Sequence, residues 1–176
     1  MSVAQAIPIR RLETLGLREI RELCDLLIDC VEGGASVSFM LPISRATAED
    51  FWRGVGASAA LAERILLAAY DSSGIIIGSV QILTAQPENQ PHRADVAKML
   101  VLRRARRQGV GGALLAAAEN CARDAGKTLL VLDTASGDAE RLYSRLGWQR
   151  CGLIPGFALL PHGGLCDTTI FYRVLQ

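Results

Sequence analysis

The sequence lacks a surplus of basic side chains. Its 19 lysine and arginine residues are balanced by 18 aspartate and glutamate residues, which gives a formal net charge of +1 at pH 7. A protein that grips a phosphodiester backbone through many contacts carries a clear basic excess, because each phosphate is neutralised by a cation. We therefore expect no nucleic-acid partner.

Cysteine and histidine are scarce and follow no pattern. The five cysteines are odd in number and form no CxxC pair, and the two histidines, His92 and His162, fall in expected loops without regular spacing. Disulfide frameworks and zinc sites both need repeated, regularly spaced residues. These absences favour reduced thiols in a cytoplasmic protein and argue against a metal site.

Long apolar runs are also missing. The N-terminal stretch MSVAQAIPIRR contains no apolar segment of the signal-peptide kind, and no uninterrupted run approaches the ~20 residues of a membrane span. Half of the 176 residues are nevertheless hydrophobic, which excludes wholesale disorder and suffices for one core. The expectation is a single domain over residues 1–176 that is soluble and cytoplasmic, with no membrane partner.

The hydrophobic pattern alternates between the periods of strands and helices. Strands are expected at residues 6–12, 64–71, 75–85, 95–102 and 128–133 and twice between 148 and 174, and helices at 15–32, 110–126, 138–147 and from Thr47 onward. Thr47 is expected to cap its helix, and PGFALLPHGGLCD to join the last two strands. The order β-α-α-β-β-β-α-β-α-β-β predicts an α/β fold, with helices packed around one mixed sheet.

A glycine-rich turn separates one expected strand from the helix that follows it. The segment RRARRQGVGG places Gly109, Gly111 and Gly112 at a helix start, where backbone N–H groups lack intrahelical partners. These donors and the helix dipole bind phosphate well, and glycine lets the ligand approach the backbone. Arg106 or Arg107 can add a charge-assisted contact. On the residues alone, a glycine-opened helix with solvated arginines remains the alternative.

The strand, the R-x-x-G-x-G spacing and the amphipathic helix together resemble the acetyl-CoA signature of the GCN5-related N-acetyltransferases (GNAT). Further segments are similar, in this order, to the tabtoxin-resistance branch of that superfamily: GGASVSFM, HRADVAKMLVL, ARRQGVGGALL, LLVLDTASG, AERLYSRLGW and IPGFALLPHGGLCDTTIFY. The resemblance covers most of the chain from Gly33 onward. It implies the GNAT fold, a central mixed and mostly antiparallel twisted sheet flanked by helices, with an acetyl-CoA cleft between strands 4 and 5.

The resemblance also implies how acetyl-CoA binds. Its pyrophosphate would lie on the glycine-rich turn, and its pantetheine arm would pair with the preceding strand like an added strand. The implied cofactor-binding residues are Leu100, Val101, Leu102, Arg106, Arg107, Gln108, Gly109, Val110, Gly111 and Gly112. In the family this strand is commonly bulged, so that a backbone N–H near Leu100 faces the thioester oxygen.

Three side chains are candidates for the proton transfers of acyl transfer. An alkyl amine, with a pKa of about 10.4, must lose its proton, and the departing thiolate must gain one. Asp95 and Asp133, expected on adjacent strands beside the cleft, could attract and deprotonate the amine, or could merely start a strand and cap a turn. The resemblance implies that Tyr143 protonates the thiolate; packing in an apolar helix face is its alternative role.

The acceptor is expected to contact Gly34, Ser36 and Phe39 of GGASVSFM, and the PGFALLPHGG segment. Cys166 beside Asp167 suggests a thiol nucleophile, but the resemblance implies direct transfer. The resulting hypothesis is an acetyl-CoA-dependent N-acetyltransferase that acts on the amine of a small molecule, such as a toxin, antibiotic or metabolite, as a monomer or homodimer. Acetylation of a protein amine and a non-catalytic CoA-binding sensor or partner module are the alternatives.

Overall fold

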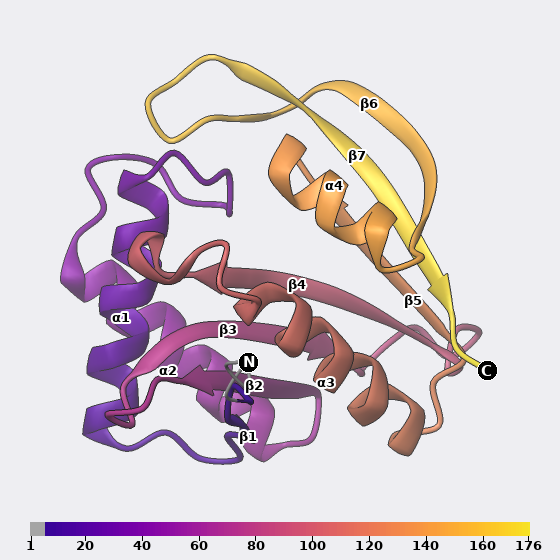
Figure 1. Cartoon of the computed structure of the whole chain (residues 1–176), viewed down its shortest axis with the longest axis horizontal. Coiled ribbons are helices and arrows are strands. Elements are labelled where there is room, and N and C mark those ends of the chain that lie inside the picture. The colour runs from indigo at the N-terminus through magenta and orange to yellow at the C-terminus, as the bar shows by residue number, and fades with distance from the viewer. Residues whose placement is uncertain (1–5) are drawn as a thin grey trace, which may run out of the picture.

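The computed structural model describes residues 6–176, which form one seven-stranded sheet with helices on both faces (Figure 1). The elements are β1 (Ile9–Arg11), α1 (Leu17–Glu32), α2 (Arg45–Ala60), β2 (Arg64–Tyr70), β3 (Ile76–Leu83), β4 (Arg93–Val101), the 3-10 turn η1 (Arg103–Ala105), α3 (Val110–Asp124), β5 (Leu129–Thr134), α4 (Gly137–Arg145), β6 (Gln149–Leu159) and β7 (Leu165–Val174). The strands lie in the order β1-β2-β3-β4-β5-β7-β6, and only β4 and β5 pair in parallel. The predicted order of elements and the mixed, mostly antiparallel sheet are confirmed.

Two separate hydrophobic clusters hold the helices against the sheet. Helix α3 packs on one face, and α1 with α2 packs on the other. Successive residues of β2 enter the two clusters in turn: Leu67 lies beneath α3, whereas Leu66 lies beneath α1 and α2. Burial on both faces explains why β2 and β3 are nearly continuous apolar runs. No helix within residues 6–176 is long and apolar enough to cross a membrane.

Strand β4 separates from β5 after the first third of its length. The two strands pair only where Arg93–Asp95 faces Leu129–Val131, although both continue beyond that point. Against β3, the register of β4 shifts because two residue steps from Ser79 to Gln81 face three from Ala97 to Leu100. Lys98, in this bulge, has a φ of 49°. The β5-β7-β6 part of the sheet therefore turns away from β1–β4, as Figure 1 shows.

Two local predictions are wrong. Helix α2 begins at Arg45, because Ser44 is its N-cap: the Ser44 hydroxyl accepts a hydrogen bond from the Thr47 amide at 3.0 Å. Thr47 therefore lies inside the first turn and does not cap the helix. Strand β6 extends to Leu159, so only residues 160–164 join it to β7. Pro155 is accommodated because it falls in a stretch where the β6–β7 register is irregular.

Gly78 of β3 brings α3 close to the sheet. A Cβ added at Gly78 would lie 2.9 Å from the carbonyl oxygen of Leu100 and 3.0 Å from side-chain atoms of Val110 and Leu114. Only glycine leaves room for this approach without displacing a neighbour. The contact fixes the start of α3 beside the end of β4, where the cleft described below opens.

Candidate active site

Two adjoining cavities lie where β4 and β5 separate. The large cleft, of about 920 Å³, runs from the α1–α2 loop along β4 to the start of α3 and to α4. The small cavity, of about 280 Å³, lies between the α1–α2 loop and the β6–β7 hairpin. Both are lined by Ser36, Ser38, Asp133 and Ala135. The shared residues define a junction at which a molecule in one cavity would meet a molecule in the other.

The glycine-rich turn forms one end of the large cleft. Gly109 is the N-cap of α3 with a φ of 87°, and Arg107 also has a positive φ, of 62°. A Cβ added at Gly111 would lie 3.0 Å from Cδ2 of Leu142 on α4, so glycine keeps this part of the cleft open. The first intrahelical bond runs from Ala113 to Gly109, which leaves the preceding amides available to an anion. The predicted residues that line the cleft here are Arg106, Arg107, Gly109, Val110, Gly111 and Gly112.

The arginines before this turn have different partners. Arg103 forms an ion pair with Asp29 of α1 at 2.8 Å, and Arg104 forms one with Asp71 at 3.6 Å. Arg107 makes no side-chain hydrogen bond or ion pair with any other residue in the range 6–176. Arg107 is therefore the basic side chain of this group that is best placed to meet a bound anion.

Two predicted cofactor residues do not reach the large cleft. Leu100 and Val101 line it, but the amide of Leu102 donates to a β3 carbonyl at 3.0 Å, and Leu102 lies outside the lining. Gln108 also lies outside, because its side-chain amide donates to the carbonyl of Arg104 at 2.9 Å. The cofactor contacts predicted for Leu102 and Gln108 therefore stay predictions: the amide of Leu102 extends the pairing of β4 with β3, and the side chain of Gln108 stabilises the turn.

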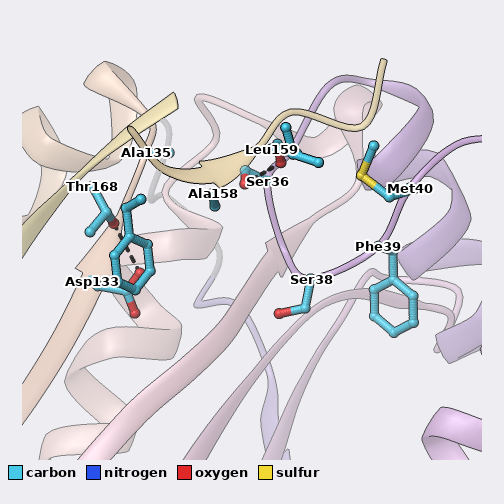
Figure 2. Close-up of a pocket in the computed structure, with 10 residues that line it drawn as sticks. Ser36, Ser38, Phe39, Met40, Asp133, Ala135, Ala158, Leu159 and Thr168 are labelled. Carbon is cyan, nitrogen blue, oxygen red and sulfur yellow. Dashed lines mark hydrogen bonds between the residues drawn. The ribbon is translucent and has the colours of Figure 1, made fainter. Parts of the chain in front are cut away.

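Asp133 lies at the junction of the two cavities. Its Oδ2 accepts a hydrogen bond from the hydroxyl of Thr168 at 3.0 Å, and Thr168 itself is buried on β7. Figure 2 shows this pair on one side of the small cavity and Ser38 with Phe39 on the other. Oδ1 of Asp133 accepts no hydrogen bond from residues 6–176. The carboxylate is thus oriented by Thr168 and keeps one oxygen for a ligand.

Asp95 lies outside both cavities. It pairs with Val131 in the closed part of the sheet, and the lining of the large cleft begins at Val96. The carboxylate forms an ion pair with Arg93 and accepts a hydrogen bond from Nε2 of Gln86 at 3.1 Å. The structure therefore does not bring Asp95 together with Asp133 as a second carboxylate in the cleft.

Tyr143 lines the large cleft from α4 and is also part of the core. It is 5% exposed, and its ring packs against Trp148 and Phe171 with centroid distances of 5.9 and 5.7 Å. Burial, together with the negative charge of Asp133, raises the pKa of the Tyr143 phenol. The packing role and the acid role considered from the sequence are therefore compatible, because packing keeps the phenol protonated.

The α1–α2 loop and the β6–β7 hairpin meet over the cavities. Gly34 and Ser36 line the large cleft, and Ser36 and Phe39 line the small cavity. The hydroxyl of Ser36 donates a hydrogen bond to the carbonyl of Leu159 at 3.2 Å. The ring of Phe39 packs edge-on against that of Phe51, with a centroid distance of 5.2 Å. The three predicted acceptor residues are therefore brought to the cavities by one loop.

Lys98 is a cleft residue that the sequence analysis missed. It lies in the β4 bulge, and its Nζ donates to the hydroxyl of Ser38 at 2.9 Å. Burial lowers the pKa of Lys98, and the carboxylate of Asp133 opposes that shift. The available signal was a single lysine in the otherwise apolar segment VAKMLVL.

Cys166 lines neither cavity, and its thiol donates to the hydroxyl of Ser36 at 3.6 Å. Nothing in this geometry aims the sulfur at the junction around Asp133. Within residues 6–176, no three His, Cys, Asp or Glu side chains are grouped so that they could hold a metal ion.

The fold and the site together indicate a class of protein: a group-transfer enzyme whose cleft opens between two separated strands and ends at a glycine-rich helix start suited to an anion. Comparison with known families agrees, since the model for the acetyltransferase (GNAT) domain matches residues 62–150. An uncharacterized N-acetyltransferase in the hisH–hisA intergenic region of Azospirillum brasilense is 32% identical over 129 residues, covering 72% of this chain and 74% of that protein. The chain belongs to the GNAT family of N-acetyltransferases.

Solved structures share the whole fold. A phosphinothricin acetyltransferase from Sinorhizobium meliloti, in complex with acetyl-CoA, matches with a TM-score of 0.79 at 19% identity over 97% of this chain and 89% of that one. A ribosomal-protein-alanine N-acetyltransferase from Brucella melitensis matches with a TM-score of 0.76 at 20% identity over 96% and 99%. The predicted superfamily and GNAT fold are confirmed, whereas the tabtoxin-resistance branch is not distinguished from its neighbours.

Proposed function

We propose that this chain is an acetyl-CoA-dependent N-acetyltransferase that moves an acetyl group directly to the amine of a small molecule, within one catalytic domain. The observation that supports this most is the meeting of two cavities of different character at Asp133. One cavity ends at a helix start suited to phosphate, and the other is a small chamber beside a carboxylate. Two substrates would therefore approach each other at the group best suited to accept a proton.

The residues of the large cleft fit acetyl-CoA. The open amides at the start of α3, with Arg107 beside them, would hold the pyrophosphate. Gly111 leaves the space between α3 and α4 that a larger side chain would fill. The part of β4 that does not pair with β5, including Leu100 and Val101, would offer backbone groups to the pantetheine arm. When bound, acetyl-CoA supplies an acetyl group activated as a thioester.

The small cavity supports a small-molecule acceptor. Its walls include the apolar side chains of Phe39, Met40 and Phe157, and its volume of about 280 Å³ matches a compact molecule. The Brucella relative is named for action on a ribosomal protein, so a peptide amine is the competing acceptor. The size of the small cavity favours the small molecule, and the hydrogen bond from Ser36 to the carbonyl of Leu159 joins the loop and the hairpin that border it.

The residues at the junction divide the proton transfers between them. Asp133 attracts the ammonium group of the acceptor and takes its proton on Oδ1, while Thr168 holds Oδ2 in place. A backbone N–H at the β4 bulge stabilises negative charge that develops on the reacting carbonyl oxygen. Tyr143 keeps its phenolic proton and delivers it to the departing sulfur.

Acetyl-CoA is expected to stabilise the folded protein. A ligand present at a hundred times its dissociation constant adds about 2.7 kcal/mol to the free energy of unfolding, because it binds only the folded chain. Thermal unfolding with increasing acetyl-CoA should therefore show a rising Tm that follows the ligand concentration. An unchanged Tm at millimolar acetyl-CoA would contradict the proposed function.

Replacing Tyr143 with phenylalanine is expected to reduce kcat by about 10²-fold, because the acid that protonates the sulfur is lost. Burial raises the pKa of this phenol, so it stays protonated at and above the ~10 of a free tyrosine. The ratio of wild-type to Tyr143→Phe activity should therefore stay constant from neutral to mildly alkaline pH. A ratio that falls steadily toward one between neutral pH and pH ~9 would show that the phenol ionises there and is not a buried acid.

A further inference from the structure

Lys98 is positioned at the acceptor end of the large cleft and not at its phosphate-binding end. Its side chain reaches across from β4 to Ser38, which lines both cavities. The phosphate-binding turn lies beyond the end of β4 and after η1. The Lys98 ammonium therefore faces the junction where the acceptor would lie.

The ammonium of Lys98 and the carboxylate of Asp133 present opposite charges to one junction. Both groups line the large cleft, and the charge of Asp133 raises the pKa of Lys98, yet no ion pair joins them within 4.0 Å. Their separation leaves room for a ligand group between them. A molecule with a cationic and an anionic group close together would meet a complementary partner at each end.

Lys98 forms no hydrogen bond or ion pair with a carboxylate of residues 6–176. Within residues 6–176 its one side-chain hydrogen bond is to the neutral hydroxyl of Ser38, and its pKa is lowered mainly because burial removes water. An ammonium that is partly desolvated without an adjacent carboxylate binds a ligand oxyanion favourably, because the ligand replaces the lost water. By contrast, Nζ of the chain's other lysine, Lys127, donates to the carbonyls of Thr84 and Pro91 far from the cleft.

We propose that Lys98, assisted by the hydroxyl of Ser38, binds an oxyanion of the acceptor and so selects amines that carry a carboxylate or similar group a few bonds from the nitrogen. This proposal rests on the proposed N-acetyltransferase function. The acceptor amine is directed to Asp133 and its anionic group to Lys98, and its remaining atoms extend into the apolar part of the small cavity. Lys98 is then a specificity-determining residue of the acetyl transfer.

The test compares matched pairs of acceptors that differ only in the anionic group. Each pair consists of an α-amino acid with an apolar side chain and the amine that remains when its carboxyl group is removed. With the wild-type protein, we expect kcat/KM for the amino acid to exceed that for the bare amine by about 10- to 100-fold, the effect of one charge-assisted hydrogen bond. Most of the difference should lie in KM, because the contact is made before the chemical step.

Variants of the two lysines locate the effect. Lys98→Met should bring the ratio of the two kcat/KM values close to one, and Lys98→Arg should retain most of the preference because it keeps the charge. Lys127→Gln, the matched control, should leave the ratio at the wild-type value. A purely structural role of the Lys98–Ser38 hydrogen bond would lower both kcat/KM values together and leave their ratio unchanged.

The possible failures are distinguishable. If the wild-type protein acetylates bare amines as well as amino acids, or if Lys98→Met retains the wild-type ratio, the proposal for Lys98 is wrong and the proposed function stands. If acetyl-CoA binds but no amine of either kind is acetylated, the proposed function fails, and the role of Lys98 fails with it. If Lys98→Met does not fold, Lys98→Gln takes its place, with the same expected loss of the preference.

Discussion

Asp133→Asn is expected to lower kcat for N-acetylation by about 10²- to 10⁴-fold, the range over which a positioned general base contributes. Asparagine has nearly the same shape and still offers an oxygen to the hydroxyl of Thr168, so the packing at the end of β5 should survive. It cannot take a proton from the acceptor ammonium. Steady-state kinetics with a saturating amine would measure the loss, and titration should show unchanged affinity for acetyl-CoA.

Asp124→Asn provides the control for this prediction. Asp124 is an exposed carboxylate at the end of α3 that lines neither cavity, so its loss changes the same net charge without touching the site. Its kcat should equal that of the wild type. An Asp133→Asn protein that kept more than half of the wild-type kcat would remove Asp133 from the role of base.

Gly111→Val is expected to weaken acetyl-CoA binding by about 10- to 100-fold, which corresponds to the loss of one or two charge-assisted hydrogen bonds. A Cβ at this position already lies 3.0 Å from Leu142, so the two further methyl groups must enter the space between α3 and α4. That space is where the open amides of the helix start face a bound phosphate. Isothermal titration with acetyl-CoA would measure the change in Kd.

The matched control is Gly54→Val, which places the same side chain on a helical glycine of α2. Gly54 is exposed, and a Cβ there meets no atom within 4 Å. This variant carries the same change in helix propensity but should bind acetyl-CoA with wild-type affinity. Equal affinities for the two variants would show that the start of α3 is not the phosphate site.

The order of the elements was predictable because the periodicity of the apolar residues is strong. Burial on both faces makes β2 and β3 nearly continuous apolar runs, and α3 presents one face to the core, so none of the three elements could be confused with a loop. The exact residues at which helices begin and end were harder to predict. Ser44 and Thr47 are both good caps, and only the direction of the chain entering α2 decides that Ser44 accepts the amide bond.

The site was predictable only where a local motif determines it. The turn around Gly109 needs no distant partner, because a glycine with positive φ and a helix start suffice. Asp95 and Asp133 look similar in the sequence, since one begins and the other ends an expected apolar strand. They differ in their partners: Arg93 and Gln86, which are near in sequence, hold Asp95, whereas Thr168, 35 positions away, orients Asp133 in the cleft.

Lys98 and Ser38 illustrate what periodicity cannot reveal. A lysine within a strand is ordinarily directed to solvent, but the bulge of β4 turns this one into the cleft. Its partner lies 60 positions earlier, in a loop whose path depends on contacts with the β6–β7 hairpin. Such a pair follows from the assembled sheet, and no spacing in the sequence encodes it.

The central claim is that this chain acetylates small amines at the junction around Asp133. Release of the CoA thiol from acetyl-CoA, measured with one panel of small amines and one of peptides and confirmed by mass spectrometry of the acetylated product, tests it most directly. The account predicts release with members of the small-amine panel, dependent on Asp133, and little with peptides. Release only with peptides, or binding of acetyl-CoA without release in either panel, would contradict it.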